Sequence, residues 1–498
     1  MGALADERLL GMRRGIEKES LRSRADGMVA LTPHPPALGS ALTHPRITTD
    51  FSESQLELIT GIHPSAEACL AELTRIHQFV YRNIGDEMLW VGSMPCGLPA
   101  DDEIPIARFG SSNVGRAKSI YRMGLSHRYG RRMQTISGIH YNWSMPGVTS
   151  EQYFGLIRNF RRHSFLLLFL FGASPAVCSS FVAGREHNLQ TLMGQTLGLP
   201  NATSLRMGRL GYQSDAQSSL AVSYNSLESY AGSLHEALTR PHPAYEAIGI
   251  RGPDGKYRQL DDTLLQIENE FYGTIRPKRV IQPGERPLHA LRERGVEYVE
   301  VRCMDLDPFE PVGISAATGR FIDMFLLHCL LADSPPDTPR EIAALARNQD
   351  STAMRGREQG LLLERGEQEV RLTDWGLELV EQLAPVAVAL DRLDGGRNHR
   401  SALEAACATL QGECSAPSAT VLEVMNSKFD GSYVQFIRSQ SAAARQALLE
   451  LPWPAELAAH FRGLAEQSIE DQRALEAADS MPFEQYREHY LSPARLIA

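Results

Sequence analysis

The chain has 498 residues and a net charge of -10, and 43% of its residues are hydrophobic. These values are ordinary for a soluble globular protein. The acidic balance argues against a general nucleic-acid-binding protein, which needs a basic surface to displace counterions. The strongest apolar run, Phe165 to Phe171, is far shorter than the roughly 20 residues of a membrane-spanning helix. We therefore expect no nucleic-acid partner and no membrane partner, and we interpret the run as a buried helix turn or strand.

The seven cysteines are scattered along the chain, and none forms a Cys-x-x-Cys pair. Zinc sites and disulfide frameworks usually show tighter spacing. The N-terminal segment also lacks the apolar core of a signal peptide. We therefore interpret the cysteines as reduced thiols and expect a cytoplasmic protein.

The first ~300 residues combine short extended segments with turns rich in glycine, proline and asparagine. Apolar residues at helical spacing predict helices between these segments, over 66–82 and 152–162. The expected strands include 15–21, 56–60, 135–144 and 296–305.

After about Gly313 the pattern becomes mostly helical. Thr373 or Asp374 is expected to cap a helix that runs toward Leu393 and stops at Gly395. Another long amphipathic helix is expected over 454–478. Because no linker interrupts the chain, we expect a single α+β unit over 1–498, with the sheet in 1–313 and a helical part in 314–498.

Carboxylates alternate with other residues in two of the expected strands. Glu17 and Glu19 would point to the same face, because side chains alternate along a strand. Two such carboxylates repel unless a cation lies between them. Glu57 interrupts the apolar run 56–59 and would face a polar cavity. Each segment taken alone is also compatible with an ordinary strand that has one face in water.

Two later strands show the same alternation. In 137–143, His140 and Asn142 share one face, and the other face is aromatic and apolar. In 296–303, Glu300 and Arg302 share a face opposite three core residues. A structural histidine and a surface ion pair worth less than ~1 kcal/mol are the simpler alternatives.

The four segments together favour metal-dependent phosphoryl chemistry. Carboxylates with an occasional imidazole suit Mg²⁺ or Mn²⁺. Arginine suits phosphate because its planar fork binds two oxygens at once. No Gly-x-x-x-x-Gly-Lys-Ser/Thr motif occurs in the chain, so a sheet lined with carboxylates is a better hypothesis than a P-loop.

These segments belong to a longer series of motifs that resembles the proteobacterial glutamate–cysteine ligases. The blocks follow the family order over about the first 310 residues, and the helical part matches more loosely. They include GIEKESLR (15–22), ALGSALTHPRITTDF (37–51), LELITGI (56–62), MQTISGIHYN (133–142), LFGASPAVCSSF (170–181), ATSLRMGRLGY (202–212), LQIENEFYGTIRPKR (265–279) and VEYVEVRCMDLDPF (296–309). Cys303 stands where serine is common in the family, and its alternation places it away from the site.

The resemblance implies a glutamine-synthetase-like curved antiparallel sheet that forms a funnel for ATP, Mg²⁺ (or Mn²⁺) and the substrates glutamate and cysteine. By resemblance, the divalent-metal ligands are Glu17, Glu19, Glu57, His140 and Glu300. Arg206 and Arg302 would face the transferred phosphoryl group, and Asp50 would be a metal ligand or an anchor for the amine. The cysteine pocket would consist of Phe51, Tyr121, Arg122, Tyr212 and Tyr272.

The implied reaction joins the γ-carboxyl group of glutamate to the amine of cysteine through γ-glutamyl phosphate, the first step of glutathione biosynthesis. A monomer with feedback inhibition by glutathione is expected. Three alternatives remain open from the sequence: a ligase with another amine acceptor, a non-catalytic binding protein, and a guanidino kinase on a similar sheet.

Overall fold

A curved antiparallel sheet lies at the centre of the computed structural model, which describes residues 5–211, 220–282 and 284–497. Six strands are hydrogen-bonded in the order β2-β3-β1-β5-β10-β9, and β4 pairs with the end of β1. All pairs are antiparallel. The strands are β1 (Arg13–Ser23), β2 (Ile47–Thr49), β3 (Gln55–Ile59), β4 (Met88–Leu89), β5 (Ile139–Ser144), β9 (Ile275–Lys278) and β10 (Tyr298–Met304).

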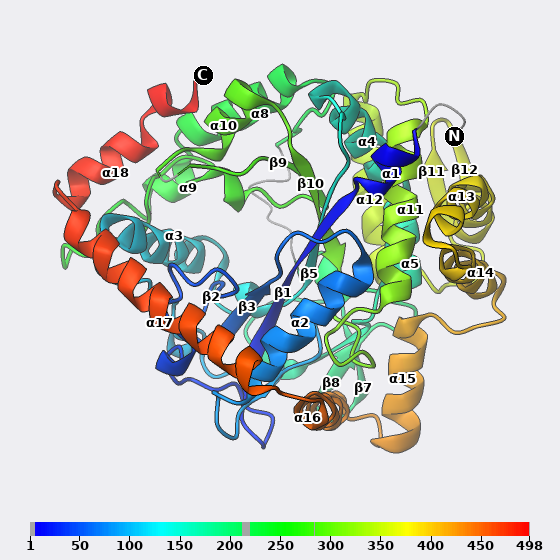
Figure 1. The fold of residues 1–498 in the computed structure, drawn as a ribbon, viewed down its shortest axis with the longest axis horizontal. Coiled ribbons are helices and arrows are strands. Elements are labelled where there is room, and N and C mark those ends of the chain that lie inside the picture. The colour runs from blue at the N-terminus through cyan, green and yellow to red at the C-terminus, as the bar shows by residue number, and fades with distance from the viewer. Residues whose placement is uncertain (1–4, 212–219, 283, 498) are drawn as a thin grey trace.

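One face of the sheet is apolar because every second residue of its strands is hydrophobic. Ile139, Tyr141 and Trp143 of β5 are fully buried on this face. Four helices from both halves of the chain pack here, and Figure 1 shows α5 and α11 along this side of the sheet. They are α2 (Ala66–Tyr81), α4 (Ser150–His163), α5 (Phe165–Phe171) and α11 (Ala316–Leu331).

The opposite face of the sheet is polar and looks toward α3 (Asn113–Tyr129) and α18 (Phe483–Leu491), which lie on the other side of the strands in Figure 1. Ser112 begins α3 by accepting a hydrogen bond from the backbone N–H of Gly115. Two further helices, α8 (Leu227–Thr239) and α10 (Pro287–Arg294), lie near β9 in Figure 1.

Most of the chain after Gly313 is helical, as predicted, although a two-stranded hairpin interrupts it. The hairpin consists of β11 (Leu362–Arg365) and β12 (Gln368–Arg371). The remaining helices of this part are α12 (Pro339–Arg355), α13 (Leu372–Asp394), α14 (Asn398–Gln411), α15 (Pro417–Lys428), α16 (Tyr433–Glu450) and α17 (Ala455–Ala478). No helix in the described ranges is long and apolar enough to cross a membrane.

Two predicted boundaries are wrong. The helix α13 begins at Leu372 after Arg371, so neither Thr373 nor Asp374 is its cap. The chain passes directly from β12 into this helix, so the helix starts before the predicted cap residues. The strand β5 begins at Ile139 and not at residue 135, because 133–135 form a 3₁₀ turn.

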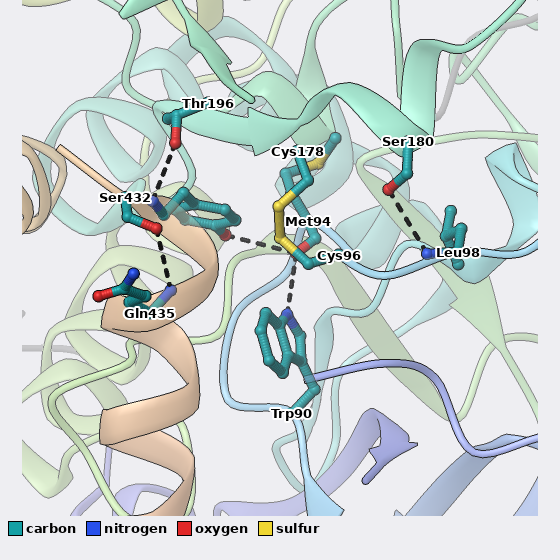
Figure 2. The surroundings of a disulfide bond; sticks show 10 residues. Trp90, Met94, Cys96, Leu98, Cys178, Ser180, Thr196, Ser432 and Gln435 are labelled. Carbon is teal, nitrogen blue, oxygen red and sulfur yellow. Dashed lines mark hydrogen bonds between the residues drawn. A yellow bond between two sulfur atoms is a disulfide. The ribbon is translucent and has the colours of Figure 1, made fainter. Parts of the chain in front are cut away.

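The interpretation of all seven cysteines as reduced thiols is also wrong. Cys96 and Cys178 form a disulfide across 82 positions of sequence, a separation that gives no local signal. Cys178 ends β6 (Ala176–Cys178), which pairs with β8 (Thr196–Gly198) and, through it, β7 (Gln190–Met193). The loop of Cys96 is held against this small sheet, as Figure 2 shows. Cys69, Cys303, Cys329, Cys407 and Cys414 are free.

The loop of Cys96 supports the polar face of the main sheet. The indole N–H of Trp90 donates a hydrogen bond to the carbonyl of Met94, at 3.1 Å (Figure 2). The backbone carbonyl of Ser93 accepts a hydrogen bond from the backbone N–H of Ser137. The side-chain hydroxyl of Ser93 accepts one from the backbone N–H of Leu306. The loop therefore fixes the residues that precede β5 and follow β10.

Candidate functional site

The register of the sheet places the predicted polar residues in one continuous group. Glu17 lies opposite His140, Glu19 lies opposite Glu57, and Glu300 lies opposite Asn142. Directly opposed residues of an antiparallel pair share a face. The alternation seen in each strand therefore adds up to one polar surface across β3, β1, β5 and β10.

This surface forms the floor of a cavity of about 440 Å³. Eleven of the thirteen predicted site residues line it. They are Glu17, Glu19, Asp50, Phe51, Glu57, Tyr121, Arg122, His140, Tyr272, Glu300 and Arg302. Arg206 lines an adjoining cavity of about 360 Å³, which shares Tyr272 and Arg302 with the first. Tyr212 lies outside the described residues.

His140 lies at the centre of the carboxylates. Its Nδ1 atom is 3.2 Å from Glu17 and 3.9 Å from Glu300, and its Nε2 atom is 3.7 Å from Glu19. Ligand atoms of Glu17, Glu57 and His140 all lie within 4.8 Å of one another. The His140 Nε2 atom is buried and has no hydrogen-bond partner in the described part of the chain. A divalent cation bound among these atoms would give the His140 Nε2 atom a partner and would offset the charge of the carboxylates.

The pKa shifts of these carboxylates and of His140 also indicate a cation site. Burial raises the pKa of Glu19 to about 8, and the nearby Asp50 adds to this effect. Burial also raises the pKa of Glu57 well above its usual range, with neighbouring carboxylates adding to it. Burial and the charge of Arg302 lower the pKa of His140, so the imidazole is neutral near pH 7. Crowded carboxylates beside a neutral imidazole form a donor set that fits Mg²⁺ or Mn²⁺.

Basic side chains lie on the sheet beside these carboxylates. The Arg302 guanidinium lies 3.2 Å from one oxygen of Glu300, and the Lys278 ammonium lies 3.3 Å from the other. Arg206 donates a hydrogen bond to the carbonyl of Arg302 at 2.8 Å. A Cβ atom at Gly138 would lie 2.0 Å from the Arg206 guanidinium, so only glycine leaves room for this side chain.

The helix α3 and the segment that carries Tyr272 form an aromatic end of the cavity. Tyr121 and Arg122 project from α3, and Arg122 donates a hydrogen bond to the carbonyl of Asp50. The Tyr272 hydroxyl accepts a hydrogen bond from the amide of Gln134 at 3.0 Å. This end combines aromatic surface with the basic side chains of Lys118 and Arg122 and the carboxylate of Asp50, which suits a small amino acid.

Several lining residues lie outside the predicted set. From the sequence, the basic segment 275–279 close to Tyr272 could bind phosphate or could be solvated. In the structure, Arg276 and Lys278 lie on the polar face of β9 and line the cavity. Tyr486 and Tyr490 of α18 also line the cavity. They lie more than 180 positions after Arg302, the last predicted residue that lines the cavity, and no local pattern connects them to the site.

Comparison with known proteins agrees with this geometry. The family model for glutamate-cysteine ligase matches residues 3–352. The chain is 47% identical to a glutamate–cysteine ligase of Alcanivorax borkumensis, over 98% of this chain and 97% of the relative. It is 49% identical to one from a Janthinobacterium species, over 96% of this chain and 94% of that protein.

Solved structures show the same fold. A crystal structure of glutamate–cysteine ligase from Francisella tularensis in complex with AMP superposes with a TM-score of 0.92 at 37% identity, and covers 97% of this chain and 98% of that one. A bifunctional glutathione synthetase from Pasteurella multocida superposes with a TM-score of 0.71 at 24% identity over 92% of this chain and 57% of its own, which shows the fold alone.

Proposed function

The chain belongs to the glutamate–cysteine ligase family, and from this premise we propose how its residues catalyse the ATP-dependent joining of glutamate to cysteine, the first step of glutathione biosynthesis. The observation that carries the proposal is the cavity in which carboxylates, an imidazole and Arg302 meet on one face of the sheet, with Arg206 in the adjoining cavity. Membership of a ligase family also removes the binding-protein and guanidino-kinase alternatives.

The carboxylates and His140 are proposed to hold divalent metal ions together with the phosphates of ATP. Glu17, Glu57 and His140 have the closest ligand atoms, and Glu19 and Glu300 complete the set. Bound Mg²⁺ would neutralise charge on the phosphates and orient them for transfer. Mn²⁺ is an alternative for the same donors. The AMP in the Francisella relative supports nucleotide binding in this fold.

Arg206 and Arg302 are proposed to bind the phosphoryl group as it moves to the γ-carboxylate. An oxygen of that carboxylate attacks the γ-phosphorus of ATP, and ADP leaves. The acyl phosphate that results is needed because a free carboxylate has no good leaving group. The two guanidinium groups are buried or partly buried, so their charges are weakly screened and act strongly on the transferred group.

The aromatic end of the cavity is proposed to hold cysteine. Phe51, Tyr121, Arg122 and Tyr272 surround it, and the proposal also includes Tyr212, whose position is not described. The amine attacks the acyl carbon, phosphate leaves, and Asp50 is proposed to accept the amine proton. Positioning of the two reactants should supply several kcal/mol of the rate enhancement, on the order of effects measured for intramolecular reactions.

Three further properties are proposed from family resemblance. The protein is proposed to act as a monomer in the cytoplasm, and glutathione is proposed to inhibit it as a feedback signal. The division of 1–313 and 314–498 within one catalytic unit is also retained, and the Tyr486 and Tyr490 side chains support it because they bring the helical part to the cavity.

Cysteine is expected to be the preferred amine. Purified protein with Mg-ATP and glutamate should be given cysteine, serine, alanine or leucine, while ADP release and the amide product are followed together. We expect the highest kcat/KM with cysteine and equal amounts of ADP and γ-glutamylcysteine. Equal turnover with leucine would contradict the assignment of the acceptor, and ADP without any amide would contradict the ligase mechanism.

A further inference from the structure

A buried carboxylate outside the cavity connects two of its walls. Glu270, in the 3₁₀ turn Glu268–Glu270, is 1% exposed. One of its oxygens accepts hydrogen bonds from the Arg128 guanidinium at 2.9 Å and the Tyr129 hydroxyl at 2.8 Å. The other accepts from the backbone N–H of Gln266 at 2.8 Å and from its side-chain amide at 3.2 Å. Four donors therefore fix this carboxylate.

The first connection runs to α3. Arg128 and Tyr129 lie in the last turn of this helix, and Tyr121 and Arg122 of the proposed cysteine pocket lie on the same helix about two turns earlier. The Arg128 guanidinium also donates to Gln259 at 3.0 Å, so its orientation is determined. It stacks over the ring of Tyr245 at 4.0 Å. The end of α3 cannot move without breaking these contacts.

The second connection runs to the wall that carries Tyr272. This residue follows Glu270 by two positions, so fixing the 3₁₀ turn fixes the start of its segment. The Tyr272 ring packs edge-on against the ring of Tyr129, with centroids 5.8 Å apart and an interplanar angle of 72°. Tyr129 thus contacts both the carboxylate and the pocket residue.

A third contact reinforces the connection in the middle of α3. The Gln266 side chain packs against Gly124, where a Cβ atom would lie 2.2 Å from its amide oxygen. Its amide nitrogen donates to Glu270 and also lies 3.4 Å from the carbonyl of Tyr121. The carboxylate is therefore linked to Tyr121 through one intervening side chain.

Net stability is a weak explanation for this arrangement. Arg128 and Glu270 form an ion pair in which both side chains have 0% exposure. The desolvation cost of such a pair roughly cancels the attraction between its charges. Its clearer physical effect is geometric, because several directional hydrogen bonds hold two elements at one separation.

We propose that Glu270 is a positioning residue for the amine acceptor: it sets the separation between the Tyr121 wall on α3 and the Tyr272 wall, and so determines the affinity for cysteine. The inference rests on the proposed location of the cysteine pocket. Glu270 is not among the residues that line the cavity. Its effect should therefore appear in the KM for cysteine and not in chemistry on glutamate or ATP.

The variant Glu270→Gln tests the proposal. Glutamine has nearly the same shape, but its amide NH₂ group replaces one carboxylate oxygen and must face two of the four donors, so at least one bond is lost. We expect the KM for cysteine to rise about tenfold, with kcat within about threefold of wild type and unchanged KM values for glutamate and ATP. Such a pattern indicates weaker acceptor binding at an intact catalytic centre.

Asp323→Asn is the matched control. Asp323 is 2% exposed and accepts hydrogen bonds from Arg14 at 2.9 Å and from the Tyr141 hydroxyl at 3.0 Å, the same partner types as Glu270. It lies on α11, which packs on the apolar face of the sheet. We expect this variant to lose stability in urea unfolding while its KM for cysteine changes less than twofold.

Two results would overturn the inference. One is an equal change of the KM for cysteine in both variants, which would indicate a general structural effect. The other is an unchanged KM in Glu270→Gln. If Glu270→Gln does not fold, Tyr129→Phe decides. It removes the hydroxyl, with its bonds to Glu270 and Tyr245, and keeps the ring that packs on Tyr272. A rise of the KM for cysteine is expected, and a wild-type value contradicts the proposal. Failure of the proposed function would appear separately, as wild-type protein that does not prefer cysteine.

Discussion

Replacing Glu300 by glutamine is expected to lower kcat by about 10²–10³-fold while the protein remains folded. The side chain is 1% exposed on the polar face of β10, with one oxygen 3.3 Å from Lys278 and the other 3.2 Å from Arg302. Glutamine keeps the size of the side chain but removes its charge. A proposed metal ligand is then lost, and two neighbouring cations lose their common counterion.

The measurement is the steady-state rate over a wide range of Mg²⁺ concentration, together with urea unfolding. Glu72→Gln is the matched control, because Glu72 also pairs with two basic side chains, Arg46 and His63, away from the cavity. We expect the control to retain activity within about twofold. Near-wild-type rates for Glu300→Gln at every Mg²⁺ concentration would remove Glu300 from the metal site.

Arg302→Lys is expected to lower kcat by about 10²-fold although the positive charge is kept. The planar guanidinium of Arg302 lies where the two cavities meet and can bind two phosphate oxygens at once. A lysine ammonium is a single point charge on a flexible chain. The transition state of phosphoryl transfer should lose stabilisation, and the KM for cysteine should change little.

Arg279→Lys provides the comparison for this prediction. Arg279 directly follows β9, and its guanidinium donates to the carbonyls of Arg294 and Gly295 outside the cavity. Wild-type turnover is expected for this control. If Arg302→Lys turned over as fast as the control, a phosphoryl-binding role for the Arg302 fork would be refuted.

Much of the sheet and its polar face can be predicted from local alternation. Glu17 with Glu19, His140 with Asn142, and Glu300 with Arg302 each share a face because successive strand residues point in opposite directions. The fold class predicted from the motif series is confirmed by the superposition on the Francisella enzyme. Local pattern alone does not give the order of the strands, because pairing depends on contacts distant in sequence.

The parts that escaped prediction all depend on long-range packing. Cys96 and Cys178 meet because β6, which pairs with β8 and ends at Cys178, lies beside the loop of Cys96. Tyr490 reaches the cavity from α18 because Arg286 stacks on its ring and pairs with Glu268. No window of neighbouring residues contains this information.

The central claim is that the γ-carboxylate of glutamate is activated by phosphorylation within the cavity. The most direct test uses glutamate with heavy oxygen in its γ-carboxylate, together with cysteine and Mg-ATP. Transfer through an acyl phosphate must move one labelled oxygen into inorganic phosphate in each turnover, with ADP as the nucleotide product. Phosphate without the label, or AMP and pyrophosphate as products, would contradict the mechanism even if γ-glutamylcysteine were formed.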